Sequence, residues 1–161
     1  MITTFERSTP FAEPEFRPPS EASHLLTRIH ALTRDAARAL GMDAEAAEQA
    51  ALDGGLVLDG EAVLISPVAL GAAEANSLVI SVSLGRRVGQ MPVSALSSVL
   101  AQAPGLLAVH RMTIGCDPDG ELMLHGTADA GTATSASLAR DLLAVRQLAV
   151  LLQDFTATRT Q

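Results

Sequence analysis

The chain of 161 residues has no lysine, no tryptophan and no tyrosine, and its only cysteine is Cys116. Without lysine it cannot form a Walker-type phosphate loop, a Schiff base or a pyridoxal phosphate site. Without tryptophan and tyrosine it has little material on which nucleic acid bases could stack. A single cysteine excludes an internal disulfide and a cysteine-rich zinc site, and is typical of a reducing compartment. We therefore expect a cytoplasmic protein.

Basic side chains are also few. The chain has 11 basic and 18 acidic side chains, which gives a formal net charge of −7 and a pI near 4.9. Such a chain repels nucleic acid phosphates and anionic membranes. It lacks the run of about 20 apolar residues that a membrane span needs, and residues 1–20 carry charges and four prolines where a signal peptide would be apolar. We expect no nucleic acid partner and no membrane insertion.

The length and the 48% hydrophobic content predict one folded domain with a buried core. Residues 1–20 differ from the rest, because they hold four prolines and three of the four phenylalanines. We predict a flexible N-terminal arm here. It is either a frayed end or a short segment that docks in a groove of this protein or of a partner. The single α+β domain is expected at 21–155, followed by a flexible C-terminal tail at 156–161.

Apolar spacing predicts three helices. Leu25, Ile29 and Leu32 lie three or four residues apart, in a helix that Ser20 caps and Gly41 ends. Residues 134–155 have the same spacing and are apolar enough to be buried. A shorter helix is expected at 92–102, opened by Pro92 and closed by Pro104-Gly105. Residues 42–55 remain open between a short helix capped by Asp43 and a direct lead into a strand.

Alternation of apolar and small polar residues predicts strands, most clearly at 77–84. Residues 56–58 and 61–66 form a hairpin about Asp59-Gly60, which suits a turn with positive φ, and Pro67 is expected to end its second strand. Residues 107–116 and 121–127 form another hairpin. The predicted order is α-β-β-β-α-β-β-α. It corresponds to an α+β fold, an antiparallel sheet with helices packed on it.

Two histidines come nearest to a chemical site. If Cys116 pairs with Glu121 across the turn, His110 and His125 lie diagonally on one sheet face. A third ligand is missing, so we predict no metal site. No nucleophile, paired acid or phosphate loop stands out elsewhere. We expect no catalytic residue, no cofactor and no enzymatic activity.

The pattern as a whole resembles the type III secretion chaperones of the CesT/SycE-like group over about residues 20–155. The resemblance rests on the capped first helix, the acidic Leu58-Asp59-Gly60-Glu61 hairpin and the Leu78–Leu84 strand. It continues in the Val93-Ser94-Ala95-Leu96 helix, the hairpin from Met112 to Leu124 and the long closing helix. The arm with its prolines and phenylalanines is similar to the broad-specificity HpaB-like branch. The chain departs from many relatives by lacking an aromatic residue at 146–148.

The resemblance implies a bacterial cytoplasmic chaperone and no enzyme. Such proteins are homodimers that hold the N-terminal regions of secreted effectors in extended form and deliver them to the secretion apparatus and its ATPase. A second copy, effector proteins and the secretion ATPase are therefore the implied partners. Two other functions stay open: a small-ligand-binding α+β domain, or a structural subunit of a larger assembly.

The chain has more apolar residues than one core would bury, and we expect the remaining ones to form interfaces. We expect the dimer interface on the 92–102 helix and the strand after it, at Val93, Leu96, Val99, Leu100, Leu106 and Leu107. We expect effector segments to bind the first helix and the sheet, at Leu25, Ile29, Leu32, Val63, Ile65, Met112, Ile114 and Met123. In the 61–66 strand either Val63 and Ile65 face outward and Leu64 inward, or the reverse.

Overall fold

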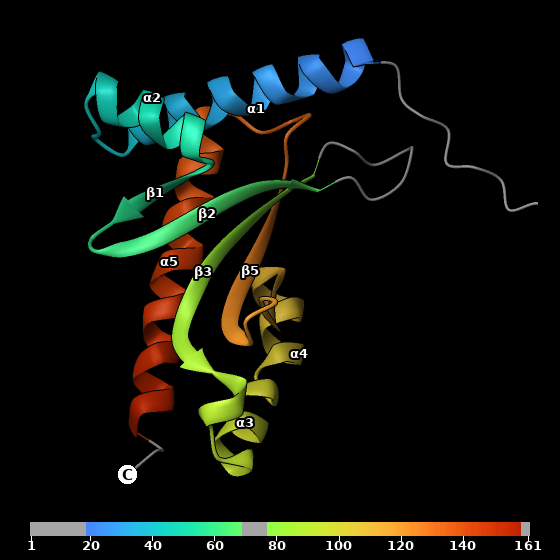
Figure 1. The fold of residues 1–161 in the computed structure, drawn as a ribbon, viewed down its shortest axis with the longest axis vertical. Helices are drawn as coiled ribbons and strands as arrows, with labels where there is room; N and C mark the ends of the chain where they lie inside the picture. Colours follow the sequence, from blue (N-terminus) through green and yellow to red (C-terminus); the bar gives the residue numbers. More distant parts are fainter. Residues whose placement is uncertain (1–18, 69–76, 159–161) are drawn as a thin grey trace, which may run out of the picture.

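The computed structural model describes residues 19–68 and 77–158, in which helices pack on a five-stranded antiparallel sheet (Figure 1). The α+β prediction is confirmed. The elements are α1 (Pro19–Ala39), α2 (Ala44–Asp53), β1 (Gly55–Leu58), β2 (Glu61–Val68), β3 (Ser77–Arg87), η1 (Val88–Gln90), α3 (Val93–Leu100), α4 (Ala103–Gly105), η2 (Leu106–His110), β4 (Met112–Cys116), β5 (Glu121–Asp129) and α5 (Ser135–Thr158). Of the predicted arm, residues 1–18 lie outside the described residues, as do residues 159–161 of the predicted tail.

The strand order is β1-β2-β3-β5-β4, so β1 and β4 form the two edges of the sheet. The β1–β2 hairpin turns at Asp59 and Gly60, which have φ values of 49° and 88°. Two successive positive φ angles define the turn that an Asp-Gly pair favours, because it matches the twist of the strands. The predicted hairpin is therefore present.

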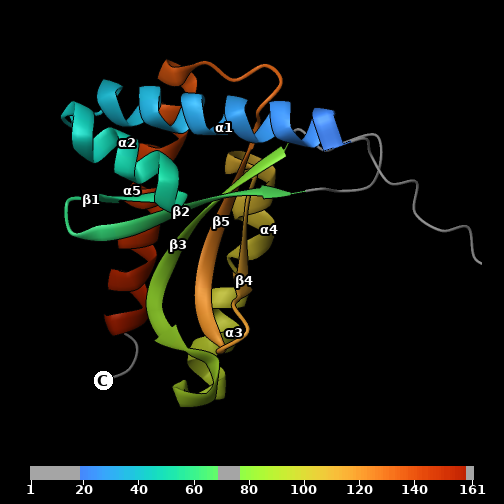
Figure 2. The ribbon, with the colours of Figure 1, turned by 45° about the horizontal axis from the view of Figure 1, so that its top comes forward.

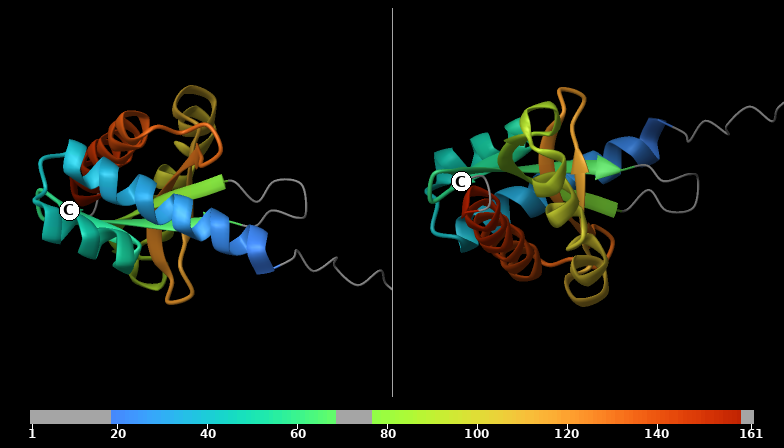
Figure 3. Two further views of the ribbon diagram at one scale, coloured as in Figure 1. Left: turned by 90° about the horizontal axis from the view of Figure 1, so that it is seen from above. Right: turned by 90° about the horizontal axis from the view of Figure 1, so that it is seen from below.

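The inner face of β3 forms the centre of the core. Leu78, Ile80, Val82 and Leu84 alternate with small residues, and each is at most 1% exposed. Helix α5 runs along this face of the sheet (Figure 2), and its buried residues Leu138, Leu142 and Val145 join the same core cluster. Seen from above, α1 crosses over one end of the sheet (Figure 3).

Residues 42–55, for which the sequence left two alternatives, contain a helix, α2. The Asp43 side chain accepts a hydrogen bond from the Ala46 backbone N–H at 2.8 Å, which satisfies one of the free donors of the first turn. Gly54 ends the helix with a left-handed φ of 65°. Small side chains at Ala47 and Ala50 are buried, and α2 packs closely on α1.

The chain between β3 and β4 stays helical for longer than the sequence predicts. Pro104 lies in the first turn of α4, where its missing N–H costs no hydrogen bond, so it does not end the helical path. Leu106 is buried and anchors η2 to the core. The predicted strand at 107–116 is therefore wrong in its first half, because β4 begins only at Met112, after Arg111 with φ 55°.

Pro67 does not end β2, which continues to Val68. The backbone N–H of Ile65 donates to Gly54 O, on the β1 side of the strand. The backbone nitrogen of Pro67, two residues on, faces the same side. β1 pairs only with residues 61–64, so β1 does not pair with Pro67 on that side. The missing N–H of the proline therefore costs no hydrogen bond between strands.

Candidate binding surfaces

The two histidines do not share a sheet face. Cys116 pairs with Leu122 and Thr113 with His125, one residue away from the expected register, and His110 lies in η2. The register shifts because the turn closes between Asp117 and Glu121, whose backbones bond at 3.0 Å. Asp117 Oδ1 also accepts from Glu121 N at 2.8 Å. Among residues 19–68 and 77–158, no three His, Cys, Asp or Glu side chains gather to hold a metal ion.

His125 is half-buried on the outer face of the sheet, which faces away from α5. Its Nδ1 atom shares a 2.8 Å hydrogen bond with Ser81 Oγ on β3. On its other side, a Cβ atom at Gly115 would lie 3.0 Å from Nε2, so the glycine makes room for the ring. Burial lowers the pKa of His125 below its ordinary value of 6.5.

The free energy of unfolding should fall in acid partly through this residue. In the unfolded chain His125 binds a proton near pH 6.5, whereas the folded protein holds it neutral to lower pH. Below pH 6.5 the unfolded state therefore binds more protons than the folded state. The free energy of unfolding decreases as the pH is lowered, until the pH reaches the pKa of His125 in the folded protein. Between about pH 7.5 and about pH 5, the wild type should lose more stability in urea titrations than His125→Gln. Equal losses in the two proteins would contradict this assignment.

The outer face carries a row of side chains across four strands: Leu64, Ser81, His125 and Thr113 lie opposite one another in the ladder. Leu64 is 46% exposed, whereas Val63 is fully buried and Ile65 nearly so. Of the two alternatives for β2, the structure takes the one with Leu64 outward. Val57 on the edge strand β1 lies diagonal to Leu64 and is also exposed. We call Val57 and Leu64 the β1–β2 patch.

Seven of the eight positions expected to bind effectors belong to the core cluster or pack against it, and the eighth, Met123, is buried outside that cluster. Five are buried, and three are partly buried against it: Ile29, Val63, Ile65, Met112 and Met123 form the first group, and Leu25, Leu32 and Ile114 the second. Among the described side chains, the large apolar residues that are exposed on α1, β1 and β2 are Leu26, Val57 and Leu64. Sequence reasoning missed them because strands with apolar residues on both faces do not reveal which face is covered.

The positions expected at the dimer interface divide into two groups. Val99 and Leu106 are buried and Leu96 is partly buried, so these three hold the helices to the core. Val93, Leu100 and Leu107 lie seven residues apart and are exposed, Val93 at 81% and Leu107 at 62%. With Val109 they form what we call the α3–η2 stripe.

The stripe lies in the one described segment with the length and composition of a membrane span, Val93–His110. Its mean hydropathy is 1.3, and only 17% of it is buried. The segment is divided among α3, α4 and η2 and contains serine, glutamine, proline and glycine. Its division into three short helices and its polar residues distinguish it from a single membrane-spanning helix.

Comparison with known proteins gives a likeness of fold. No family model matches the chain, and no curated protein matches it in sequence. A chain of the HopA1–SchA chaperone–effector complex superposes with a TM-score of 0.58 and 17% identity, over 83% of this chain and 97% of that one. A chain of the ExsC–ExsE complex gives 0.59 and 16%, over 81% and 94%.

A third structure is the Yersinia pestis type III secretion chaperone SycH in complex with a stable fragment of YscM2. Its TM-score is 0.51 and its identity 22%, over 77% of this chain and 98% of that one. At these identities the likeness concerns the fold. The chain has the α+β fold found in structures of type III secretion chaperone complexes.

Proposed function

We propose that this protein is a bacterial cytoplasmic chaperone, without enzymatic activity, for type III secreted effectors. It binds their N-terminal regions in extended form, as a homodimer, and delivers them to the secretion apparatus and its ATPase. The observation that carries the proposal is the shared fold with chains from chaperone–effector complexes, over 77 to 83% of this chain. We assign it to the HpaB-like branch on the proline and phenylalanine content of residues 1–20.

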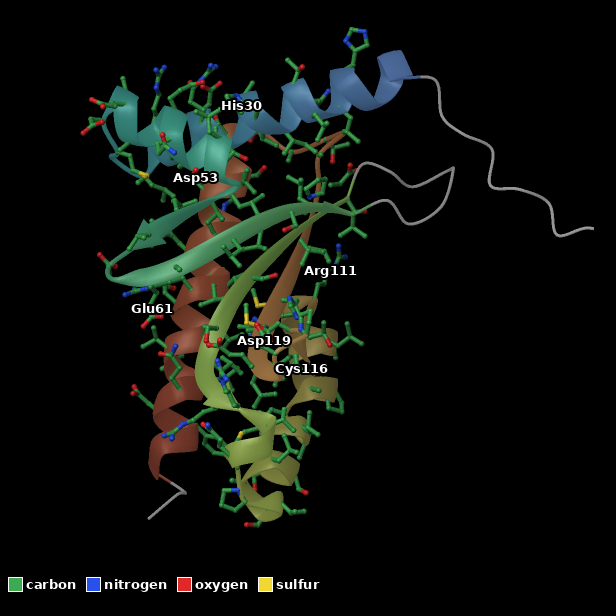
Figure 4. The ribbon with its side chains drawn as sticks, in the orientation of Figure 1. His30, Asp53, Glu61, Arg111, Cys116 and Asp119 are labelled. Atoms are coloured by element: carbon green, nitrogen blue, oxygen red, sulfur yellow. The ribbon has the colours of Figure 1, made fainter. Side chains whose placement is uncertain are left out.

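Edge strand β1 is the proposed place of binding. An extended segment added to a sheet edge gains backbone hydrogen bonds, and its alternate side chains need apolar contacts. The β1–β2 patch offers such contacts on the outer face. Asp53 and Glu61 lie at the two ends of this region (Figure 4), where they attract basic residues of the segment. Of the eight positions predicted from the sequence, Val63 and Ile65 would then act from beneath, by holding β2 in place.

Two neighbouring residues of β2, Leu64 and Val63, provide a test of binding at this edge. Leu64→Glu should change the free energy of unfolding by about 0.5 kcal/mol or less, because the side chain is exposed. It should abolish capture of secreted proteins in pull-downs from a secreting bacterium, identified by mass spectrometry. Val63→Glu should destabilise the fold by more than about 4 kcal/mol, because it buries an unpaired charge in the core.

The matched control is Leu151→Glu, the same change at an exposed leucine of α5. It should melt and capture like the wild type. The proposal expects several unrelated secreted proteins, each held through its N-terminal region, so that deleting that region releases it. If Leu64→Glu captures as well as the control, β1 is not the binding edge. If no secreted protein is captured by the wild type, the chaperone function is wrong.

A further inference from the structure

A hollow of about 160 Å³ lies where β3 ends and α3 begins, away from the β1–β2 patch. The proposed function makes no use of it. Its wall is polar and includes two arginines. The residues that line it are Gly85, Arg86, Arg87, Gln90, Met91 and Pro92.

An irregularity in β3 brings the two arginines to one hollow. Successive residues of a regular strand point to opposite faces, but the pairing of β3 with β5 shifts between Ser83 and Arg87. Gly85 adopts a φ of 65° at this point, and its N–H donates to Ser83 Oγ at 2.8 Å. Such bulges re-aim side chains and are frequent beside functional sites. The N–H of Val88 donates to Gly120 O at 2.8 Å and secures the wall.

Among the described residues, the two arginines have no ion-pair partner. Within residues 19–68 and 77–158, no carboxylate forms an ion pair with Arg86 or Arg87. Glu121 stands opposite Arg87 in the ladder, but its carboxylate accepts a hydrogen bond from the Ser83 hydroxyl. Two guanidinium groups thus line a concave site, and neither forms an ion pair with a described residue.

Charge is also divided along the chain. Residues 75–116 contain Arg86, Arg87 and Arg111 and no acid, whereas the chain as a whole carries −7. Figure 4 shows Arg111 and Asp119 toward the side of the molecule where α4 is found, and Asp53 and Glu61 on the opposite side. The apolar stripe begins at Val93, directly after Pro92 in the wall of the hollow. The two arginines of the hollow, with exposed Val93 next to it, suit an acidic group that has an apolar neighbour.

We propose that this hollow binds a carboxylate side chain of an acidic peptide segment, and that an apolar residue of the segment rests on Val93. Planar guanidinium groups bind carboxylates through paired, charge-assisted hydrogen bonds. A nucleic acid fits poorly, because a chain of net charge −7 repels a long polyanion. The hollow does not involve the β1 edge, so a test of this site is independent of a test of the proposed function.

Two blocked, fluorescent ten-residue peptides of serine and leucine provide the probe, one with three glutamates and the other with glutamines in their place. Binding to the full chain is measured by fluorescence anisotropy at low salt. Arg86→Gln and Arg87→Gln should each weaken binding of the acidic peptide about tenfold. The neutral peptide should bind no variant measurably, and raising the salt should weaken the wild type.

The double variant Arg38→Gln/Arg140→Gln removes two exposed arginines elsewhere and has the same net charge of −9 as Arg86→Gln/Arg87→Gln (−7 − 2). It should bind like the wild type, and all variants should melt like it. Equal weakening in the two double variants would overturn the proposal in favour of overall charge. So would failure of the acidic peptide to bind the wild type. Inorganic phosphate that displaces the peptide at equal concentration would show a small-anion site instead.

Discussion

Leu107→Asp should yield a folded monomer of 16.7 kDa, whereas the wild type should sediment as a dimer at micromolar concentration. Leu107 belongs to the α3–η2 stripe and is 62% exposed in the single chain. Aspartate there leaves the core untouched, but pairing of two stripes would bury an unpaired charge, which costs several kcal/mol. Leu96, although part of the predicted interface, is a poorer probe because it packs against the core.

Sedimentation equilibrium and thermal melting together check this result. The control is Leu151→Asp, which places the same charge on an exposed leucine of α5 and should remain dimeric. A wild type that is monomeric at micromolar concentration would contradict the interface and the homodimer. A Leu107→Asp protein that stays dimeric would move the interface to another face.

Gly126→Ala should destabilise the monomer fold by about 1–3 kcal/mol, the usual cost of overpacking a core. A Cβ atom at this position of β5 would lie 2.6 Å from Cγ2 of Val145 on α5, far inside van der Waals contact. Val145 is buried, so its side chain has little room to move. The glycine therefore sets how closely α5 approaches the sheet.

A double-mutant cycle in urea tests the contact. In a Val145→Ala background the offending Cγ2 atom is gone, and the nearest remaining atoms are Met112 Cγ at 3.7 Å and the Cβ at 145 at 4.0 Å. Gly126→Ala should then cost less than about 0.5 kcal/mol, since these are ordinary contacts. The same cost in both backgrounds would show that the strain lies in the backbone of β5 rather than against α5.

Several elements follow from local rules and are predictable from the residues alone. The strict alternation from Leu78 to Leu84 defines both the strand and its buried face, because its other face is made of small and mostly polar residues. Asp59-Gly60 predicts its turn because two residues with positive φ are needed there. The absence of lysine excludes phosphate-loop chemistry, and the absence of tryptophan and tyrosine leaves little material for base stacking, without reference to any fold.

Contacts between residues distant in sequence determine the other features of the structure. In β2, Val63, Leu64 and Ile65 are all apolar, so only the packing of α5 and the core determines that Leu64 faces outward. The β4–β5 register depends on how Asp117 closes its turn, which moves every cross-strand pair by one residue. Sequence alone therefore determined the fold class and the absence of familiar catalytic motifs. Tertiary structure decided which apolar residues reach the surface, because burial depends on what covers each face.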